Sequence, residues 1–452
     1  MVSMRALRAS ALAVFATLAP VAAQAESLKE ALASAYQNNP TLMSALLDVK
    51  STAEGIAIAK SGKLPTIGAS GSVGGSWSSG ELGASTDYSY TVGARYDQMI
   101  FDNYQTDASI EQARALTELS KYTLRNQEQN VLLSVVQAYY SVIRDTQLVQ
   151  LRAENLSFFD AQVSSAEDRL RLGEGTRIEV SQASTRQAQA VASYRSAIAS
   201  LQTSQASYER WVGRKPSNLT NDYNFGNMLP TSIDNAIASA DARHPALLSA
   251  RAGIRAAQAG ADAASAAFGP TLNLIGSICA IGCFGDPSIG GMSGSVNLSL
   301  SIPIYAGGAL GASIRRANIE QIRSEVDALA ARDQIRESVI SSWSSLQNST
   351  AQIESAQSAV DSGQLVVEGT IQERDVGQRT TLDVLNAQAE LTSAREGLIT
   401  ARASRMIAAF ALLSAAGRLT AEDLNLNVKI LSADGYIATV EDVWQELRAL
   451  DE

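Results

Sequence analysis

The chain has 452 residues, with 36 lysines and arginines against 46 aspartates and glutamates. This acidic balance argues against a nucleic-acid-binding protein, which would present a basic surface, so we expect no nucleic-acid partner. No nucleophile elbow, phosphate-binding loop or metal-ligand cluster occurs in the sequence. The single histidine, His244, precedes Pro245 at a predicted helix start. We therefore expect no enzyme, no cofactor and no metal.

Residues 1–25 have the pattern of a secretory signal peptide. Arg5 and Arg8 form a basic start, an apolar run follows over 9–19, and residues 23–25 read Ala-Gln-Ala, a cleavage site. The apolar run is too short to span a membrane. Its removal leaves 34 basic and 46 acidic residues, a net charge of −12. We expect an exported protein with no further apolar run of eighteen residues, which is therefore periplasmic, secreted or an outer-membrane β-barrel.

An internal repeat organises the rest of the chain. Short motifs recur at an offset of 204 or 205 positions: Asn39-Pro40 with His244-Pro245, Leu64-Pro65-Thr66 with Gly269-Pro270-Thr271, and Gly213-Arg214 with Gly417-Arg418. The constant offset predicts two similar halves, 26–219 and 232–424, joined by a linker at 220–231 and followed by a tail at 425–452.

Each half has the same predicted order of elements. A helix of about 37 residues comes first, then two strands, a very long helix, a tight turn and a return helix: 27–63, 66–101, 102–172 and 176–212, then 232–268, 270–305, 307–376 and 380–416. A helix of about 70 residues is about 105 Å long, roughly the length of two shorter ones placed end to end. Such helices must pack side by side as a bundle or a cylinder.

Heptad-like apolar spacing supports side-by-side packing of the long helices. Two such seams are Val131, Val135, Ala138, Val142 and Ile319, Ile322, Val326, Leu329. An ordinary bundle core explains either seam equally well, so it is the repeat and the lengths that favour a cylinder.

The strand segments alternate apolar and small polar residues over about ten positions, which is typical of outer-membrane strands, although a soluble hairpin has a similar pattern. Gly- and Ser-rich loops are predicted at 79–86 and 282–293. Four strands cannot close a barrel, so spanning requires two, three or four chains. Cys279 and Cys283, the only cysteines, flank the second loop, and in an oxidising compartment we expect a disulfide between them.

Two similar turns, centred on Gly173 and Gly377, connect the long helices to the return helices. Arg379, Asp383 and Asn386 follow the second turn, at the end farthest from the strands. In a ring of chains, acids at such a constriction would select cations and could close through charge-assisted bonds to arginine. The alternative is a solvated turn with an acid that suits a helix start.

The stretch from Val376 to Ala387, VGQRTTLDVLNA, closely resembles the periplasmic tip of the TolC outer-membrane efflux family. The stretch from Leu300 to Gly308 resembles that family's passage from strand to long helix, and the resemblance covers essentially the whole mature chain. It implies a mainly α-helical protein with a membrane β-barrel in the cell outer membrane. Four strands per chain would contribute to a trimeric twelve-stranded barrel, continued by a long α-helical barrel in the periplasm.

The resemblance also implies a function and partners. The homotrimer, in contact with outer-membrane lipid, would be the passive exit duct of a tripartite efflux or type I secretion system. A periplasmic adaptor (membrane fusion) protein and an inner-membrane pump of the RND or ABC type would complete the system. A long helical coiled-coil surface or structural protein without a lumen is the alternative.

By the same resemblance, the residues at the tips form the periplasmic gate. Arg379 matches the arginine that holds the closed entrance, Asp383 the first acidic ring and Glu179 the acid of the other tip. At two positions the chain departs from the family: Asn386 replaces the aspartate of a second ring, and Arg374 replaces a tyrosine of the closing network. Asn386 predicts one neutral ring and weaker cation binding at the mouth, and Arg374 predicts that the closing network differs in detail from that of the family.

Overall fold

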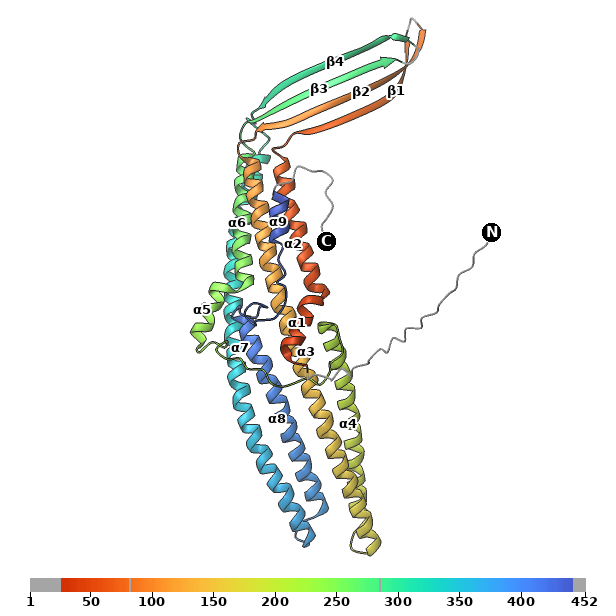
Figure 1. Ribbon diagram of the computed structural model, residues 1–452, viewed down its shortest axis with the longest axis vertical. Coiled ribbons are helices and arrows are strands. Elements are labelled where there is room, and N and C mark those ends of the chain that lie inside the picture. The colour runs from red at the N-terminus through yellow and green to blue at the C-terminus, as the bar shows by residue number, and fades with distance from the viewer. Residues whose placement is uncertain (1–25, 81–82, 284–285, 442–452) are drawn as a thin grey trace, which may run out of the picture.

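The computed structural model describes residues 26–80, 83–283 and 286–441, so the predicted signal peptide lies outside it. The molecule is elongated, with a four-stranded sheet at one end and two helical hairpins at the other (Figure 1). The first half contains α1 (Leu28–Asn38), α2 (Pro40–Ser61), β1 (Thr66–Gly80), β2 (Gly83–Phe101), α3 (Gln105–Leu172) and α4 (Arg177–Val212). The second contains α5 (Ile233–Arg243), α6 (Pro245–Ala266), β3 (Thr271–Cys283), β4 (Asp286–Ser301), α7 (Ala309–Asp375) and α8 (Thr381–Ala415), and α9 (Asp434–Glu441) follows.

The first predicted helix of each half is in fact two helices, so the prediction of one 37-residue helix was wrong. The breaks fall at Pro40 and Pro245, because proline cannot donate the helical hydrogen bond and its ring clashes with the preceding turn. Asn39 and His244 then cap the new helices by accepting hydrogen bonds from the backbone N–H of Thr41 (2.9 Å) and of Ala246 (3.2 Å). Burial lowers the pKa of His244, which favours the neutral ring that can accept this bond.

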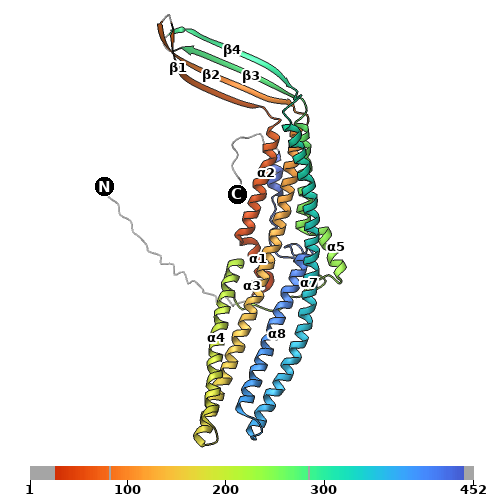
Figure 2. The same ribbon diagram turned by 180° about the vertical axis from the view of Figure 1, so that it is seen from behind.

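The two long helices each lie beside two shorter ones. α3, of 68 residues, packs against α2 in its upper part and α4 in its lower part, and α7, of 67 residues, packs against α6 and then α8 (Figures 1 and 2). α3 also contacts α6 and α8, which joins the two halves. The predicted combination of one long rod and one composite rod per half is therefore present, with α7 along one side of the layer.

The four strands form one antiparallel sheet in the order β1-β2-β3-β4. The strands run farther than predicted at the outer ends, because β1 reaches Gly80 and β2 begins at Gly83, and β3 and β4 are separated by only two residues. The predicted loops at 79–86 and 282–293 are correspondingly shorter. At the inner end β4 stops at Ser301 rather than 305, where Pro303 has no N–H to donate.

The predicted disulfide between Cys279 and Cys283 was wrong. Cys279 is a free thiol, and both cysteines belong to the same strand, β3. Four residues of extended chain span about 13 Å, whereas a disulfide needs Cα atoms less than about 7 Å apart.

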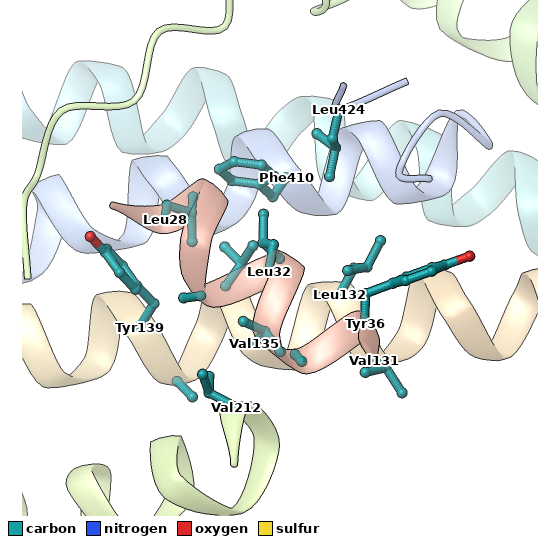
Figure 3. Close-up of a cluster of buried hydrophobic side chains, with 14 of the residues drawn as sticks. Leu28, Leu32, Tyr36, Val131, Leu132, Val135, Tyr139, Val212, Phe410 and Leu424 are labelled. Atoms are coloured by element: carbon teal, nitrogen blue, oxygen red, sulfur yellow. The ribbon is translucent and has the colours of Figure 1, made fainter. Parts of the chain in front are cut away.

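The principal core lies at the middle of the molecule, where α1 crosses α3 and the chain after α8 returns. Leu32 of α1, Val135 and Tyr139 of α3, Phe410 of α8 and Leu424 belong to one buried cluster there (Figure 3). The predicted seam on α3 is buried in this core. We call this region the equatorial core.

α8 contains an 18-residue window apolar enough to cross a membrane by length and composition, which the sequence analysis did not expect. Half of that window is buried within the protomer, where α8 packs against α7 and α3. Its apolar character therefore fits a core helix of the rod.

Candidate functional site

The tip turns have the same backbone design in both halves. Gly173 (φ 82°) and Gly377 (φ 78°) adopt the left-handed conformation that favours glycine. Three residues after each glycine a threonine begins the return helix with a capping box, formed by Thr176 with Glu179 and by Thr380 with Asp383. The repeat therefore builds two helical hairpins, α3–α4 and α7–α8, with equivalent ends.

Asp383 caps its own helix in the protomer. Its carboxylate accepts a hydrogen bond from the Thr380 backbone N–H (2.9 Å), and its own N–H donates to the Thr380 hydroxyl (3.2 Å). The backbone bond from Thr380, then the bond from its hydroxyl, lower the pKa of Asp383. Arg379 forms an ion pair with Glu373 across the turn of the same hairpin (2.9 Å). Glu373 was not singled out from the sequence, although its place one turn before Gly377 puts it within reach of Arg379.

Glu179 is engaged in the same way at the first tip. Its carboxylate accepts a hydrogen bond from the Thr176 N–H (3.1 Å) and lies 3.6 Å from the Arg169 guanidinium. Glu179 thus closes the α3–α4 turn and holds Arg169 in position.

Near the tips, three side-chain hydrogen bonds between described residues join the two hairpins of one protomer, and we call them the cross-hairpin bonds. Arg374 donates to the Gln162 carbonyl (2.8 Å), and Arg169 donates to the Thr381 hydroxyl (3.2 Å). Arg186 donates to the side-chain carbonyl of Asn386 (2.9 Å). Arg374 and Asn386, which the resemblance predicts as departures from the family pattern, both take part.

Arg169, Arg186 and Gln162 were not predicted from the sequence. Their partners lie 200 or 212 positions away, close to the repeat offset. Residues separated by about one repeat therefore lie at the same level of the two hairpins, and this is the signal that could have found them.

A small apolar cluster lies beside these polar bonds. Phe159 of α3, Ala183 of α4 and Leu385 of α8 are buried together, so the cluster also bridges the hairpins. Farther up, Thr392 donates to the side-chain carbonyl of Asn155 (2.9 Å) and Arg152 pairs with Glu396 (2.5 Å). Contacts between the hairpins thus continue from the tip toward the middle of the molecule.

The sides of the protomer expose apolar residues. The second predicted seam lies on α7, where its four members are each more than half exposed: Ile319, Ile322, Val326 and Leu329. On α2, at the opposite side of the layer, Met43, Leu47 and Ile58 are also exposed. In the sheet, β1 and β4 each have one strand neighbour within the described protomer.

Comparison with known proteins identifies the family. The model of the family described as "Outer membrane efflux protein" matches the chain twice, over residues 31–214 and 236–418. The chain belongs to this family. The two matches coincide with the two halves of the internal repeat.

Among individual proteins, the chain is 37% identical over 435 residues to the outer membrane efflux protein BepC of Brucella suis, covering 95% of this chain and 94% of that protein. It is 25% identical to the outer membrane protein TolC of Escherichia coli, covering 89% and 84%. The crystal structure of the CmeC outer membrane channel of Campylobacter jejuni shares the fold, with a TM-score of 0.78 at 15% identity over 92% of this chain and 89% of that one.

Membership confirms the predicted class and location. The strands belong in the outer membrane and the helical part extends into the periplasm, and the family consists of channel proteins rather than enzymes. The function is that of an outer-membrane exit duct for efflux, and the alternative of a lumen-free structural rod is not supported.

Proposed function

We propose that three copies of the chain close into one duct. The observation that carries this proposal is the exposed apolar seam of α7, which runs along one side of the protomer below a sheet with two open edges. Exposed seams with heptad spacing need a partner helix, and the open edges of β1 and β4 need partner strands in a membrane. α2, with its own exposed apolar residues, supplies the complementary side in a neighbouring copy. Three chains give the twelve strands expected from the family resemblance.

We assign the closed state to two sets of contacts at the tips. Within a protomer, the cross-hairpin bonds hold α7–α8 against α3–α4. Between protomers, Arg379 and Asp383 would face the neighbouring tips, with Asp383 forming an acidic ring and Asn386 a neutral one. Opening requires the α7–α8 hairpin to move away from α3–α4, which breaks both sets.

The energetics suit a gate. Hydrogen bonds and ion pairs between exposed side chains contribute only about 0.2–1 kcal/mol each. Docking of a partner with a few kcal/mol of preference for the open tips would therefore shift the equilibrium decisively. We propose that a periplasmic adaptor protein supplies this preference, and that an RND or ABC pump in the inner membrane supplies the energy for transport.

The test is single-channel conductance of purified oligomers in a planar bilayer. We expect a small, cation-preferring conductance from the wild type. Arg186→Ala with Arg374→Ala, which removes two cross-hairpin bonds, and Arg379→Ala with Asp383→Ala, which removes the expected ring contacts, should each raise the conductance several-fold.

Arg171→Ala is the matched control, because Arg171 lies at the first tip and, among the residues that the structure describes, pairs with Asp168 of its own hairpin rather than with the other hairpin. Its conductance should equal that of the wild type. Unchanged conductance in both double variants would remove the tips from gating. Folded oligomers without any conductance would overturn the duct itself.

A further inference from the structure

The two faces of the sheet differ sharply in composition. Ile67, Val73 and Trp77 of β1 and Val296 and Leu298 of β4 lie on one face and are exposed. Side chains on the other face are mostly serine, glycine and threonine. In a membrane the apolar face meets lipid, so the small polar face lines the lumen.

One charged pair stands on this polar face. Arg95 is the only lysine or arginine in residues 66–101 and 271–301, and its guanidinium binds the Asp97 carboxylate with two contacts, of 2.6 Å and 3.0 Å. Because the two residues are two apart on β2, their side chains lie on the same face of the strand.

The Arg95 side chain projects beyond the small residues that surround it on the polar face. Arg95 lies opposite Gly68 of β1 and Ser277 of β3, and both are small. The Arg95 side chain is accordingly 63% exposed even while it is paired. An exposed pair of this kind adds little stability, so its place on the wall calls for a different explanation.

The dimensions put the pair within reach of passing solutes. Twelve strands spaced about 4.8 Å apart and tilted by about 40° enclose a backbone cylinder roughly 24 Å across. Long side chains directed inward then approach the axis to within about one Debye length, roughly 8 Å. Three copies of Arg95 would stand at one height, about 20 Å along the strand from its end at Phe101.

We propose that Arg95 and Asp97 form a luminal ring that sets the charge selectivity of the barrel. Asp97 neutralises Arg95, so the ring itself carries no net charge and lets cationic and anionic cargo both pass. A carboxylate or phosphate group on a passing solute can compete with Asp97 for the fork-shaped guanidinium. The ring rests on the proposed trimeric duct and is distinct from the tips, which lie at the other end of the helices (Figure 1).

The test is the reversal potential under a KCl gradient, measured in the wild type and in the Arg186→Ala, Arg374→Ala background so that the tips do not mask the barrel. Asp97→Asn uncovers three positive charges and should raise the chloride-to-potassium permeability ratio about two- to five-fold. Arg95→Gln uncovers three negative charges and should lower the ratio by a similar factor. The double variant Arg95→Gln, Asp97→Asn should return close to its parent.

Asp87→Asn is the matched control. Asp87 lies on the same face of β2, ten residues nearer the outer end, and loses the same charge without uncovering Arg95. A ratio that shifts equally in Asp87→Asn and Asp97→Asn would overturn the ring, as would no shift in either single variant. Because these outcomes require a conducting parent, they are distinct from the absence of conductance that would overturn the duct.

Discussion

The equatorial core and the tips are built from the same long helices but are held together by opposite means. At the equator, Tyr36, Tyr139, Tyr208 and Phe410 are among the largest fully buried side chains of the described chain. At the tips, three polar side-chain bonds and one small apolar cluster join the hairpins. The difference places stability in the middle of the rod and leaves the ends free to move.

Polar groups follow the same division. Glu26 at the equator has a side chain only 4% exposed, and it pairs with Arg214 (2.7 Å) and accepts a hydrogen bond from the Tyr208 hydroxyl (2.6 Å). Arg379 and Glu373 at the tip form a single pair, and each is about half exposed. Buried networks resist opening because separation leaves charges without water, whereas exposed pairs exchange readily with solvent.

The largest loss of stability is expected from a substitution that creates a cavity in the equatorial core. Phe410 is fully buried, and its ring lies 4.9 Å from the ring of Tyr223 and 5.0 Å from that of Phe225. Phe410→Ala should lower the free energy of unfolding by about 3–5 kcal/mol, measured by urea denaturation of the oligomer. Leu172→Ala at the exposed first tip is the control and should have little effect. Equal losses in the two variants would show that stability is not concentrated at the equator.

A buried carboxyl group in the equatorial core, that of Glu128, should make the stability of the fold depend on pH. The pKa of Glu128 is raised to about 7, chiefly by burial; the Ala421 N–H bond and Arg125 oppose the rise, and Glu422 and Asp423 contribute to it. In the unfolded chain the pKa is near 4.5. The folded state therefore binds more protons between these values, and stability falls as pH rises from about 4.5 to 7.

Glu128→Gln should remove this dependence. The variant keeps an oxygen that can accept the hydrogen bond from the Ala421 N–H. At pH 8 its free energy of unfolding should exceed that of the wild type by of order 2 kcal/mol, and at pH 4 the two should be equal. Glu118→Gln is the control with the opposite sign, because the hydrogen bond from Arg255 lowers the pKa of Glu118, so its contribution is lost as pH falls. A wild-type stability that rises between pH 5 and 8 in step with the Glu128→Gln variant would contradict the buried carboxyl.

The helices, turns and strands could be predicted from the sequence where a local pattern, such as a glycine before a capping box, occurs in both halves of the repeat. Gly173 and Gly377, each followed by a threonine and an acid at the capping spacing, marked the two turns of the rod. Period-two alternation marked the four strands. Pro40 and Pro245 were also visible, but each region was predicted as one helix of about 37 residues.

The contacts between hairpins could not be predicted in the same way. Which side chain of α3 meets which side chain of α7 depends on how the helices cross, and a sequence does not record that. The prediction of a disulfide between the two cysteines was wrong for a related reason. The glycines around Cys283 indicated a loop, but strand β3 extends to this residue. The roles of Arg379, Asp383, Asn386, Glu179 and Arg374 in closing the gate stay predictions.

The smallest expected change in stability comes from the tip turn. It tests most directly whether the tips are independent of the equatorial core. Gly377 has a φ of 78° and open space around an added Cβ, so Gly377→Ala costs about 1 kcal/mol through backbone strain alone. Gly369, eight residues earlier in α7, also has open space but lies inside the helix, so Gly369→Ala should stabilise that helix by about 0.5–1 kcal/mol.

Amide hydrogen exchange separates local from global effects in these two variants. Because the tips are joined by a few weak bonds, Gly377→Ala should speed exchange around residues 373–386 and leave the urea midpoint of the whole oligomer unchanged. Gly369→Ala should slow exchange in the same hairpin. If Gly377→Ala lowers the urea midpoint as Phe410→Ala does, the tip is coupled to the equatorial core, and gating must then act through the whole rod rather than at its end.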